Sequence, residues 1–135
     1  MMIFNQDLVK SRKASSIDNI KNSDFYRFLY SDLIQRLEPI DKTYKEGLVL
    51  GFGNYHMFPI NNPYNLNYTE LDQLVLIEKK SLDLVLFPFG FHWLNDVQKF
   101  LFKVKEVLKN DGLFVCNFAG SGSLNHLRKL LFLAE

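Results

Sequence analysis

Hydrophobic positions in the second half of the chain form continuous runs on either side of a segment with helical spacing. Residues 82–87 are apolar apart from one aspartate, which predicts a strand buried on both faces. In residues 97–108 apolar positions recur three and four apart, which predicts an amphipathic helix capped by Asn95. Residues 111–112 predict a turn, and residues 113–118 a second buried strand. Strand, helix and strand in this order favour a parallel α/β sheet.

The apolar stripe of this predicted helix should pack on the sheet and be buried. It consists of Val97, Phe100, Leu101, Val104, Val107 and Leu108. Such a stripe at a spacing of three and four residues is typical of a helix that covers a core.

The first half of the chain is less regular. Residues 24–37 predict a helix that Ser23 caps, and the glycine-bounded run at residues 47–50 predicts a short buried strand. Residues 54–67 are rich in Asn and Pro and predict a loop. Residues 74–77 form a brief apolar run that fits either a helix or a strand.

The two ends of the chain show fewer patterns that predict structure. A last helix is expected from Ser123 onwards, with leucines on one face. One domain over residues 1–135 suits a chain of 135 residues, and residues 1–22 are interpreted as an N-terminal arm.

Composition excludes several classes of function. A formal net charge of +1 gives no electrostatic footprint for nucleic acid, and no apolar run reaches the length of a membrane span. The lone Cys116 cannot form an intramolecular disulfide, so we expect a reducing compartment such as the cytoplasm. His56, His92 and His126 lack metal-ligand spacing, and no catalytic nucleophile or carboxylate pair stands out.

A glycine pattern follows the first predicted strand. Gly51 and Gly53 are two positions apart, and glycines at such a point let backbone amides approach a ligand closely. A simple turn between strand and loop explains the same pattern equally well.

Four segments of the chain form an ordered set: LDLVL (82–86), HWLND (92–96), KNDGLF (109–114) and IFNQDL (3–8), the last followed by Lys10, Arg12 and Lys13. Each motif is weak alone, but the ordered set is fairly specific and covers about two-thirds of the chain. The set resembles the class I S-adenosylmethionine-dependent methyltransferase family. The similarity is to the branch with malonyl-acyl carrier protein O-methyltransferase and the complex I assembly factor.

The resemblance implies a Rossmann-like, mostly parallel sheet and S-adenosylmethionine as the cofactor. The chain resembles a shortened version, without elements between the family's first and fourth strands and at the C-terminus. Gly51 and Gly53 correspond to the glycine loop, while Val49 replaces its usual acid and Tyr55 its third glycine. We therefore expect the cofactor to bind weakly or not at all.

The resemblance also indicates further cofactor-binding residues. Glu70 or Asp72 corresponds to an acid near the adenine; alternatively, residues 74–78 are a surviving second strand with Glu78 as the ribose acid. The resemblance places His92 and Trp93 at a wall of the cofactor or substrate pocket, although packing under the next helix explains Trp93 better and a backbone contact explains His92 equally well. Phe87 lies where relatives often have a small polar residue next to the methionine part of the cofactor.

Two functions from different classes follow. Methyl transfer is implied by the resemblance. The alternative is a non-catalytic remnant that binds a protein partner through apolar surface. Because a shortened sheet has open edges and the chain has thirteen phenylalanines, we also expect a homodimer.

Overall fold

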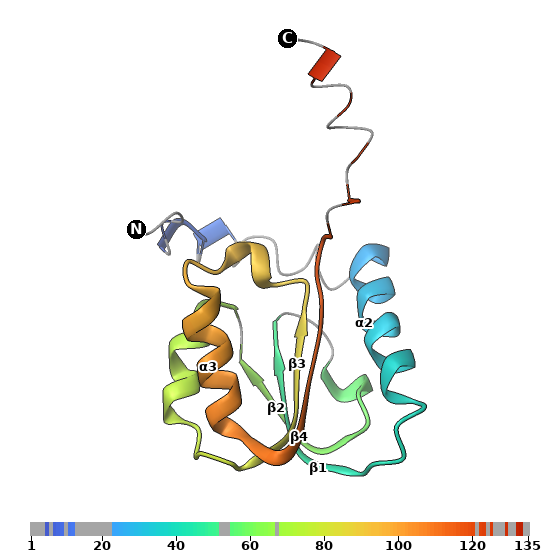
Figure 1. The fold of residues 1–135 in the computed structure, drawn as a ribbon, viewed down its shortest axis with the longest axis vertical. Helices are drawn as coiled ribbons and strands as arrows, with labels where there is room; N and C mark the ends of the chain where they lie inside the picture. The colour runs from blue at the N-terminus through green and yellow to red at the C-terminus, as the bar shows by residue number, and fades with distance from the viewer. Residues whose placement is uncertain are drawn as a thin grey trace.

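A four-stranded sheet between helices forms the body of the molecule (Figure 1). The computed structural model describes residues 5, 7–9, 11–12, 23–51, 55–66, 68–120, 122–123, 125, 129 and 132–133. Its helices are α2 (Asp24–Leu37) and α3 (Val97–Val107), and its strands are β1 (Tyr44–Leu50), β2 (Ile60–Leu66), β3 (Leu82–Pro88) and β4 (Leu108–Asn117). Three 3₁₀ segments complete these elements: η1 (Tyr55–Met57), η2 (Tyr68–Leu76) and η3 (Phe91–Trp93).

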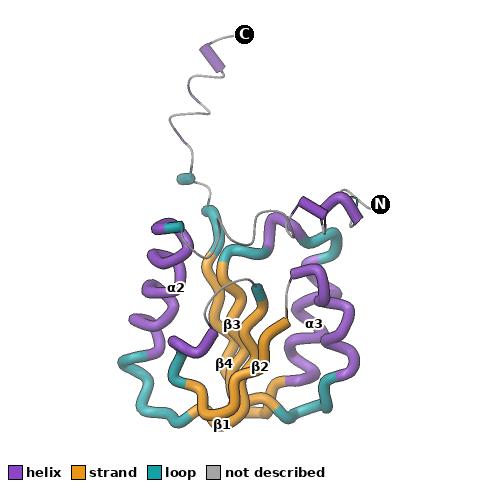
Figure 2. Tube along the Cα trace, turned by 180° about the vertical axis from the view of Figure 1, so that it is seen from behind, coloured by secondary structure: helices purple, strands orange, loops and turns teal. Residues whose placement is uncertain are grey.

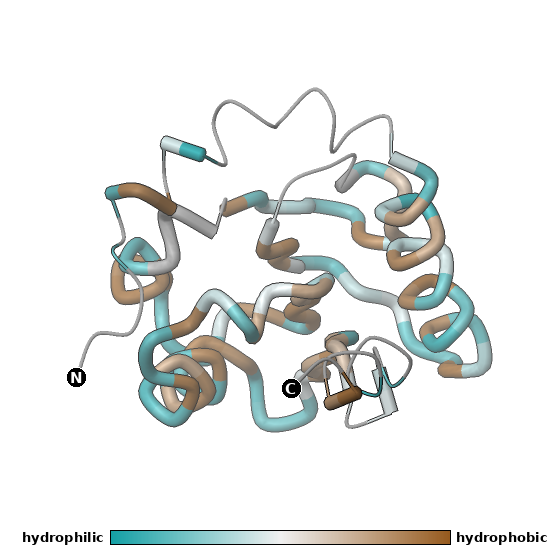
Figure 3. Tube along the Cα trace, turned by 90° about the horizontal axis from the view of Figure 1, so that it is seen from above, coloured by the Kyte–Doolittle hydropathy of each residue, from teal (hydrophilic) through white to brown (hydrophobic). Residues whose placement is uncertain are grey.

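The strands lie in the order β2-β1-β3-β4, and every neighbouring pair is parallel. Helix α2 covers one face of the sheet and α3 covers the other, as Figure 1 and the view from behind in Figure 2 show. From above, both helices carry hydrophobic and hydrophilic positions, as amphipathic covers should (Figure 3). The parallel α/β sheet predicted from the sequence is therefore confirmed.

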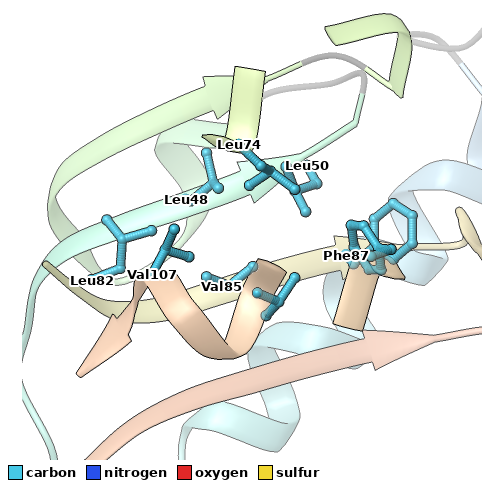
Figure 4. Close-up of a cluster of buried hydrophobic side chains, with 9 residues drawn as sticks. Leu48, Leu50, Leu74, Leu82, Val85, Phe87 and Val107 are labelled. Carbon is cyan, nitrogen blue, oxygen red and sulfur yellow. The ribbon is translucent and has the colours of Figure 1, made fainter. Parts of the chain in front are cut away.

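Two buried clusters fill the spaces between the sheet and its covers. The first, under α3 and η2, contains Leu48, Leu50, Leu74, Leu82, Val85, Phe87, Phe100, Val104 and Val107 (Figure 4). The second, under α2, contains Tyr30, Leu33, Leu37, Tyr44, Val49, Phe58, Ile60, Leu84 and Leu86. Strand β3 contributes to both clusters, so it is buried on both faces as its continuous apolar run predicted.

The prediction of a loop over residues 54–67 is wrong for half of its length. Residues 60–66 form β2, which pairs with β1 in a parallel register that places Leu50 opposite Leu66. Proline and asparagine concealed this strand because both disfavour strands on average. Strand β2 lies at the edge of the sheet, where Pro63 needs no outer partner for the N–H that it lacks.

Three local predictions also need correction. Asp96, not Asn95, caps α3, because its carboxylate accepts a hydrogen bond from the Lys99 amide at 2.8 Å. Residues 111–112 form no turn between elements, since β4 runs through them where its register against β3 shifts. Val97 and Leu101 are 38% and 39% exposed rather than buried, because α3 turns Phe100 toward the sheet.

Helix α2 has the bounds that the sequence predicted, although the Ser23 side chain accepts no capping hydrogen bond. Residues 74–77 are not a strand, because η2 extends to Leu76. Most of the predicted arm at residues 1–22 and of the helix after Ser123 lies outside the described residues. In the part of the chain that the structure describes, no helix is both long and apolar enough to cross a bilayer.

Candidate functional site at the carboxyl ends of the strands

Parallel strands end together at one edge of the sheet, and open α/β sheets bind ligands outside that edge. Here the edge is formed by the ends of β1, β2, β3 and β4, which lie at the top of the sheet in Figure 1. The starts of α2 and α3 lie at the same level (Figure 1). This edge is therefore the place to look for a functional site.

The ends of β1 and β2 are fastened to each other. Gly51 has φ 139°, a conformation that side chains rarely adopt, and its amide donates to the Leu66 carbonyl at 2.8 Å. The Asn65 carboxamide nitrogen donates to the carbonyls of Val49 and Gly51 at 3.0 and 3.1 Å. Val49, at the position where the resemblance implies an acid, is buried under α2.

The connection from β1 to β2 is short. Only residues 52–59 separate Gly51 from Ile60, and the described part of this connection contains the three-residue η1 and two bends. A crossover with a helix of its own needs about 10–12 residues. The described residues between Gly51 and Ile60 form no α-helix, whereas nucleotide-binding sheets direct a helix N-terminus at the ligand from this point.

The ends of β3 and β4 are joined through Phe89 and Asn117. The Phe89 amide donates to the backbone carbonyl and to the side-chain Oδ1 of Asn117, both at 3.0 Å. The other side-chain atom of Asn117, Nδ2, donates to Leu29 O at 2.9 Å and Asp32 Oδ2 at 3.3 Å. Asn117 thus attaches helix α2 to the carboxyl ends of two strands. The hydrogen bond from Arg36 lowers the pKa of Asp32, and the bond from Asn117 acts in the same direction.

Phe89 holds an unusual backbone conformation, with φ 48°. Bulky side chains rarely occupy this left-handed region, where a strained residue costs about 1–3 kcal/mol and often marks a functional site. The bonds to Asn117 stabilise the conformation, and the Phe89 ring contacts Phe25 edge-on at 5.2 Å.

These rings belong to an aromatic row, which we define as Phe25, Phe89, His92 and Trp93. The centroids of Phe89 and His92 lie 4.8 Å apart, and those of His92 and Trp93 lie 4.9 Å apart. Phe25 is 49% exposed and Trp93 is 37% exposed. The row joins the start of α2 to η3 and presents aromatic surface at the edge where ligands bind in such sheets.

The residues predicted to bind the cofactor do not form one cluster. Gly51 directly follows β1 and His92 lies exposed in η3, both at the carboxyl edge, whereas Gly53 lies outside the described residues. Phe87 is fully buried, so it presents no surface to a ligand.

The three acids lie elsewhere in the fold. Glu70 and Asp72 belong to η2, and of the two only Asp72 has a described side chain, which is exposed. Glu78 lies just before the amino end of β3, where its carbonyl accepts from the Ser81 hydroxyl at 2.7 Å. The reading of Glu78 as the end of a second strand is therefore wrong, because the second strand is β2.

Sequence reasoning missed Asn65 and Asn117, which join neighbouring elements at this edge through their side-chain hydrogen bonds. Asn117 is the last residue of β4 and the last but one of the predicted strand at residues 113–118, so a polar residue near a strand end was an available signal. Asn65 lay in a segment interpreted as loop. Among the residues that the structure describes, no cluster of His, Cys, Asp and Glu could hold a metal ion. Burial raises the pKa of the half-buried Cys116 thiol, as for a structural cysteine.

Comparison with known proteins shows similarity to methyltransferases. Residues 60–116 match the sequence profile of a methyltransferase domain, which runs from β2 into β4 and leaves out Gly51. A protein of Rickettsia prowazekii (strain Madrid E) that is named as a methyltransferase is 47% identical over 60 residues. Mitochondrial arginine-hydroxylase NDUFAF5 is 36% identical in Dictyostelium discoideum and 33% identical in Homo sapiens, each over 64 residues.

These matches cover 44% of this chain for the Rickettsia protein and 47% for the other two. They span only 26%, 15% and 19% of the respective relatives. No solved structure matches the chain significantly. Together with the all-parallel sheet, the profile and the relatives support a relationship to the class I S-adenosylmethionine-dependent methyltransferases for the part of the chain that they match. Proteins with this domain generally use S-adenosylmethionine.

Proposed function

We propose that this chain is a non-catalytic member of the methyltransferase family that has lost cofactor binding and acts by binding another protein. The proposal rests on the hydrogen bonds that join the carboxyl ends of β1 and β2, which we call the closed junction. Asn65 donates to the carbonyls of Val49 and Gly51 there, and the Gly51 amide is engaged by Leu66.

S-adenosylmethionine would need groups that this junction lacks in the described residues. Sheets that bind nucleosides hold the ribose hydroxyls with a carboxylate and anionic groups with a helix N-terminus. The polar side chain next to the end of β2 is the neutral Asn65, and η1 is too short to act as a helix. Because a hydrogen bond to a charged group contributes about 1.5–3 kcal/mol, losing the carboxylate alone weakens binding by about one to two orders of magnitude.

The aromatic row supports the protein-binding part of the proposal. Aromatic side chains are enriched in protein interfaces, and two members of the row are substantially exposed. The strained backbone at Phe89 points the same way, since a costly conformation persists where it serves a function. A partner would therefore dock over the carboxyl edge of the sheet.

A second candidate is chemistry on an arginine side chain, because several relatives are named arginine-hydroxylases. Methyl transfer is the corresponding candidate from the Rickettsia relative and from the family. Both candidates require a bound cofactor, so both depend on the junction that we propose to be closed.

A second copy of the chain is a further candidate partner. Strand β4 lies at an edge of the sheet and, among the described residues, pairs only with β3. Open edges favour pairing with another strand, so we propose a weak homodimer through β4. Light scattering at micromolar concentration tests it, and a monomer at all concentrations up to about 100 μM contradicts it.

Thermal unfolding with and without S-adenosylmethionine tests the main proposal. A ligand present at one hundred times its Kd stabilises the folded state by about 2.7 kcal/mol, which raises the Tm of a domain of this size by about 10 °C. We expect 1 mM S-adenosylmethionine or S-adenosylhomocysteine to change the Tm by less than about 1 °C. A rise of several degrees with either ligand would refute the loss of the cofactor site.

A further inference from the structure

Asn65 makes two hydrogen bonds that only a doubly donating side chain can make. Its Nδ2 carries two hydrogens, and the carbonyls of Val49 and Gly51 lie 3.0 and 3.1 Å from that nitrogen. An aspartate at this position would present acceptors to two acceptors. The side-chain amide of Asn65, and not a carboxylate, therefore fits between the carbonyls of Val49 and Gly51.

The position of Asn65 gives these bonds a functional meaning. In nucleotide-binding sheets, an acidic residue at the end of the second strand accepts the ribose hydroxyls. Asn65 lies one residue before the end of β2, opposite Val49 of β1 in the parallel register. It thus stands at the strand end from which a ribose acceptor would act.

We propose that Asn65 closes the nucleoside site in two ways. Its amide binds the backbone at Gly51, which we call the glycine turn, to β2. It also places a neutral group where a charged ribose acceptor would stand. This inference rests on the proposed loss of cofactor binding and assigns that loss to one side chain. Asn65 is a positioning residue for the turn and a determinant against adenosine-type ligands.

Two variants separate the two roles of Asn65. Asn65→Asp removes the donors and supplies a carboxylate that Val49 O and Gly51 O repel toward the ligand side. Asn65→Leu removes the donors and supplies no acceptor, on a larger side chain that is branched at the same carbon. Asn61→Asp is the matched control, because Asn61 lies exposed in the same strand.

The first readout is hydrogen exchange of the Gly51 amide, which donates to Leu66 O next to the Asn65 bonds. We expect exchange at least tenfold faster in Asn65→Asp and Asn65→Leu than in the wild-type chain, and unchanged in Asn61→Asp. Unchanged exchange in both Asn65 variants overturns the proposal. Asn65→Leu keeps this test available if Asn65→Asp does not fold.

The second readout is adenosine binding, measured by NMR titration of the full chain. We expect Asn65→Asp to bind adenosine at least tenfold more tightly than the wild type, with no gain in Asn65→Leu or Asn61→Asp. If folded Asn65→Asp binds adenosine no more tightly than the wild type, the proposal is overturned, even if the Gly51 amide exchanges faster. The proposed function fails separately, through tight binding of S-adenosylmethionine by the wild-type chain.

Discussion

The carboxylate of Asp83 and the ammonium group of Lys109 lie 2.7 Å apart at the amino end of the sheet and join β3 to β4. The second oxygen of Asp83 accepts from the backbone amides of Lys45 and Glu46 at 3.1 and 2.9 Å, which adds β1 to the same contact. Burial opposes the negative charge, but the bonds from the Glu46 amide and Lys109 outweigh it and lower the pKa of Asp83. One buried side chain therefore holds three strands in register.

Removing this carboxylate should destabilise the sheet strongly. Asp83→Ala leaves two strand amides and Lys109 without their acceptor, so we expect a loss of about 3–5 kcal/mol in the free energy of unfolding. Urea denaturation measures it. Asp111→Ala is the control, because Asp111 forms an exposed ion pair with Lys42, and its loss should stay below about 1 kcal/mol. Equal effects of the two substitutions would contradict the role of Asp83.

The same carboxylate should make stability depend on pH. Because the pKa of Asp83 is lower in the folded chain than its unfolded value near 4, its contribution is complete above pH 4. That contribution is lost as the pH falls through the folded pKa. Asp83→Asn carries no such charge, so its stability deficit relative to wild type should shrink between pH 6 and pH 3. A constant deficit in urea unfolding at both pH values would show that the ionised form is not preferred.

The Tyr44 hydroxyl provides a test in the opposite direction. Tyr44 is buried under α2, and its hydroxyl has no hydrogen-bond partner among the described residues. A buried polar group without a partner is costly, so Tyr44→Phe should leave stability unchanged or increase it by up to about 1 kcal/mol. Tyr44→Ala, which also removes the ring, should lose about 3–5 kcal/mol. A clear loss in Tyr44→Phe means that the hydroxyl makes a stabilising contact.

Phe100 and Leu101 are a matched pair of neighbours with opposite burial. Phe100 is 6% exposed in the cluster under α3, whereas Leu101 is 39% exposed. Phe100→Ala should therefore cost about 3–5 kcal/mol and Leu101→Ala less than about 1 kcal/mol. Chemical denaturation of both variants checks the orientation of α3, and the reverse order of the two losses would place the other face of the helix on the sheet.

Sequence alone predicted the elements whose patterns were long and regular. The run through β3 and the bounds of α2 are examples, because burial on two faces or one helical stripe leaves a clear signal. The Phe100 and Leu101 pair shows the limit of such patterns. Adjacent apolar positions at the border of a stripe differ by the rotation of the helix, which packing against the sheet decides.

The site was harder to predict than the fold. Strand β2 was hidden because Pro63 and its asparagines lower strand propensity, and only pairing with β1 overrides that preference. Without β2, the donors of Asn65 could not be placed beside Val49 and Gly51. Asn117 was similarly invisible as a contact, since its partners Leu29 and Asp32 lie on a helix at the other end of the chain.

An isothermal titration of the wild-type chain with S-adenosylmethionine tests the central claim most directly, because it measures the cofactor site without assuming any reaction. The account predicts no saturable heat with about 50 μM chain and ligand up to about 1 mM, while the same sample shows a cooperative unfolding transition. A one-to-one isotherm with a Kd at or below about 10 μM would contradict it, since the closed β1–β2 junction would then bind the cofactor after all.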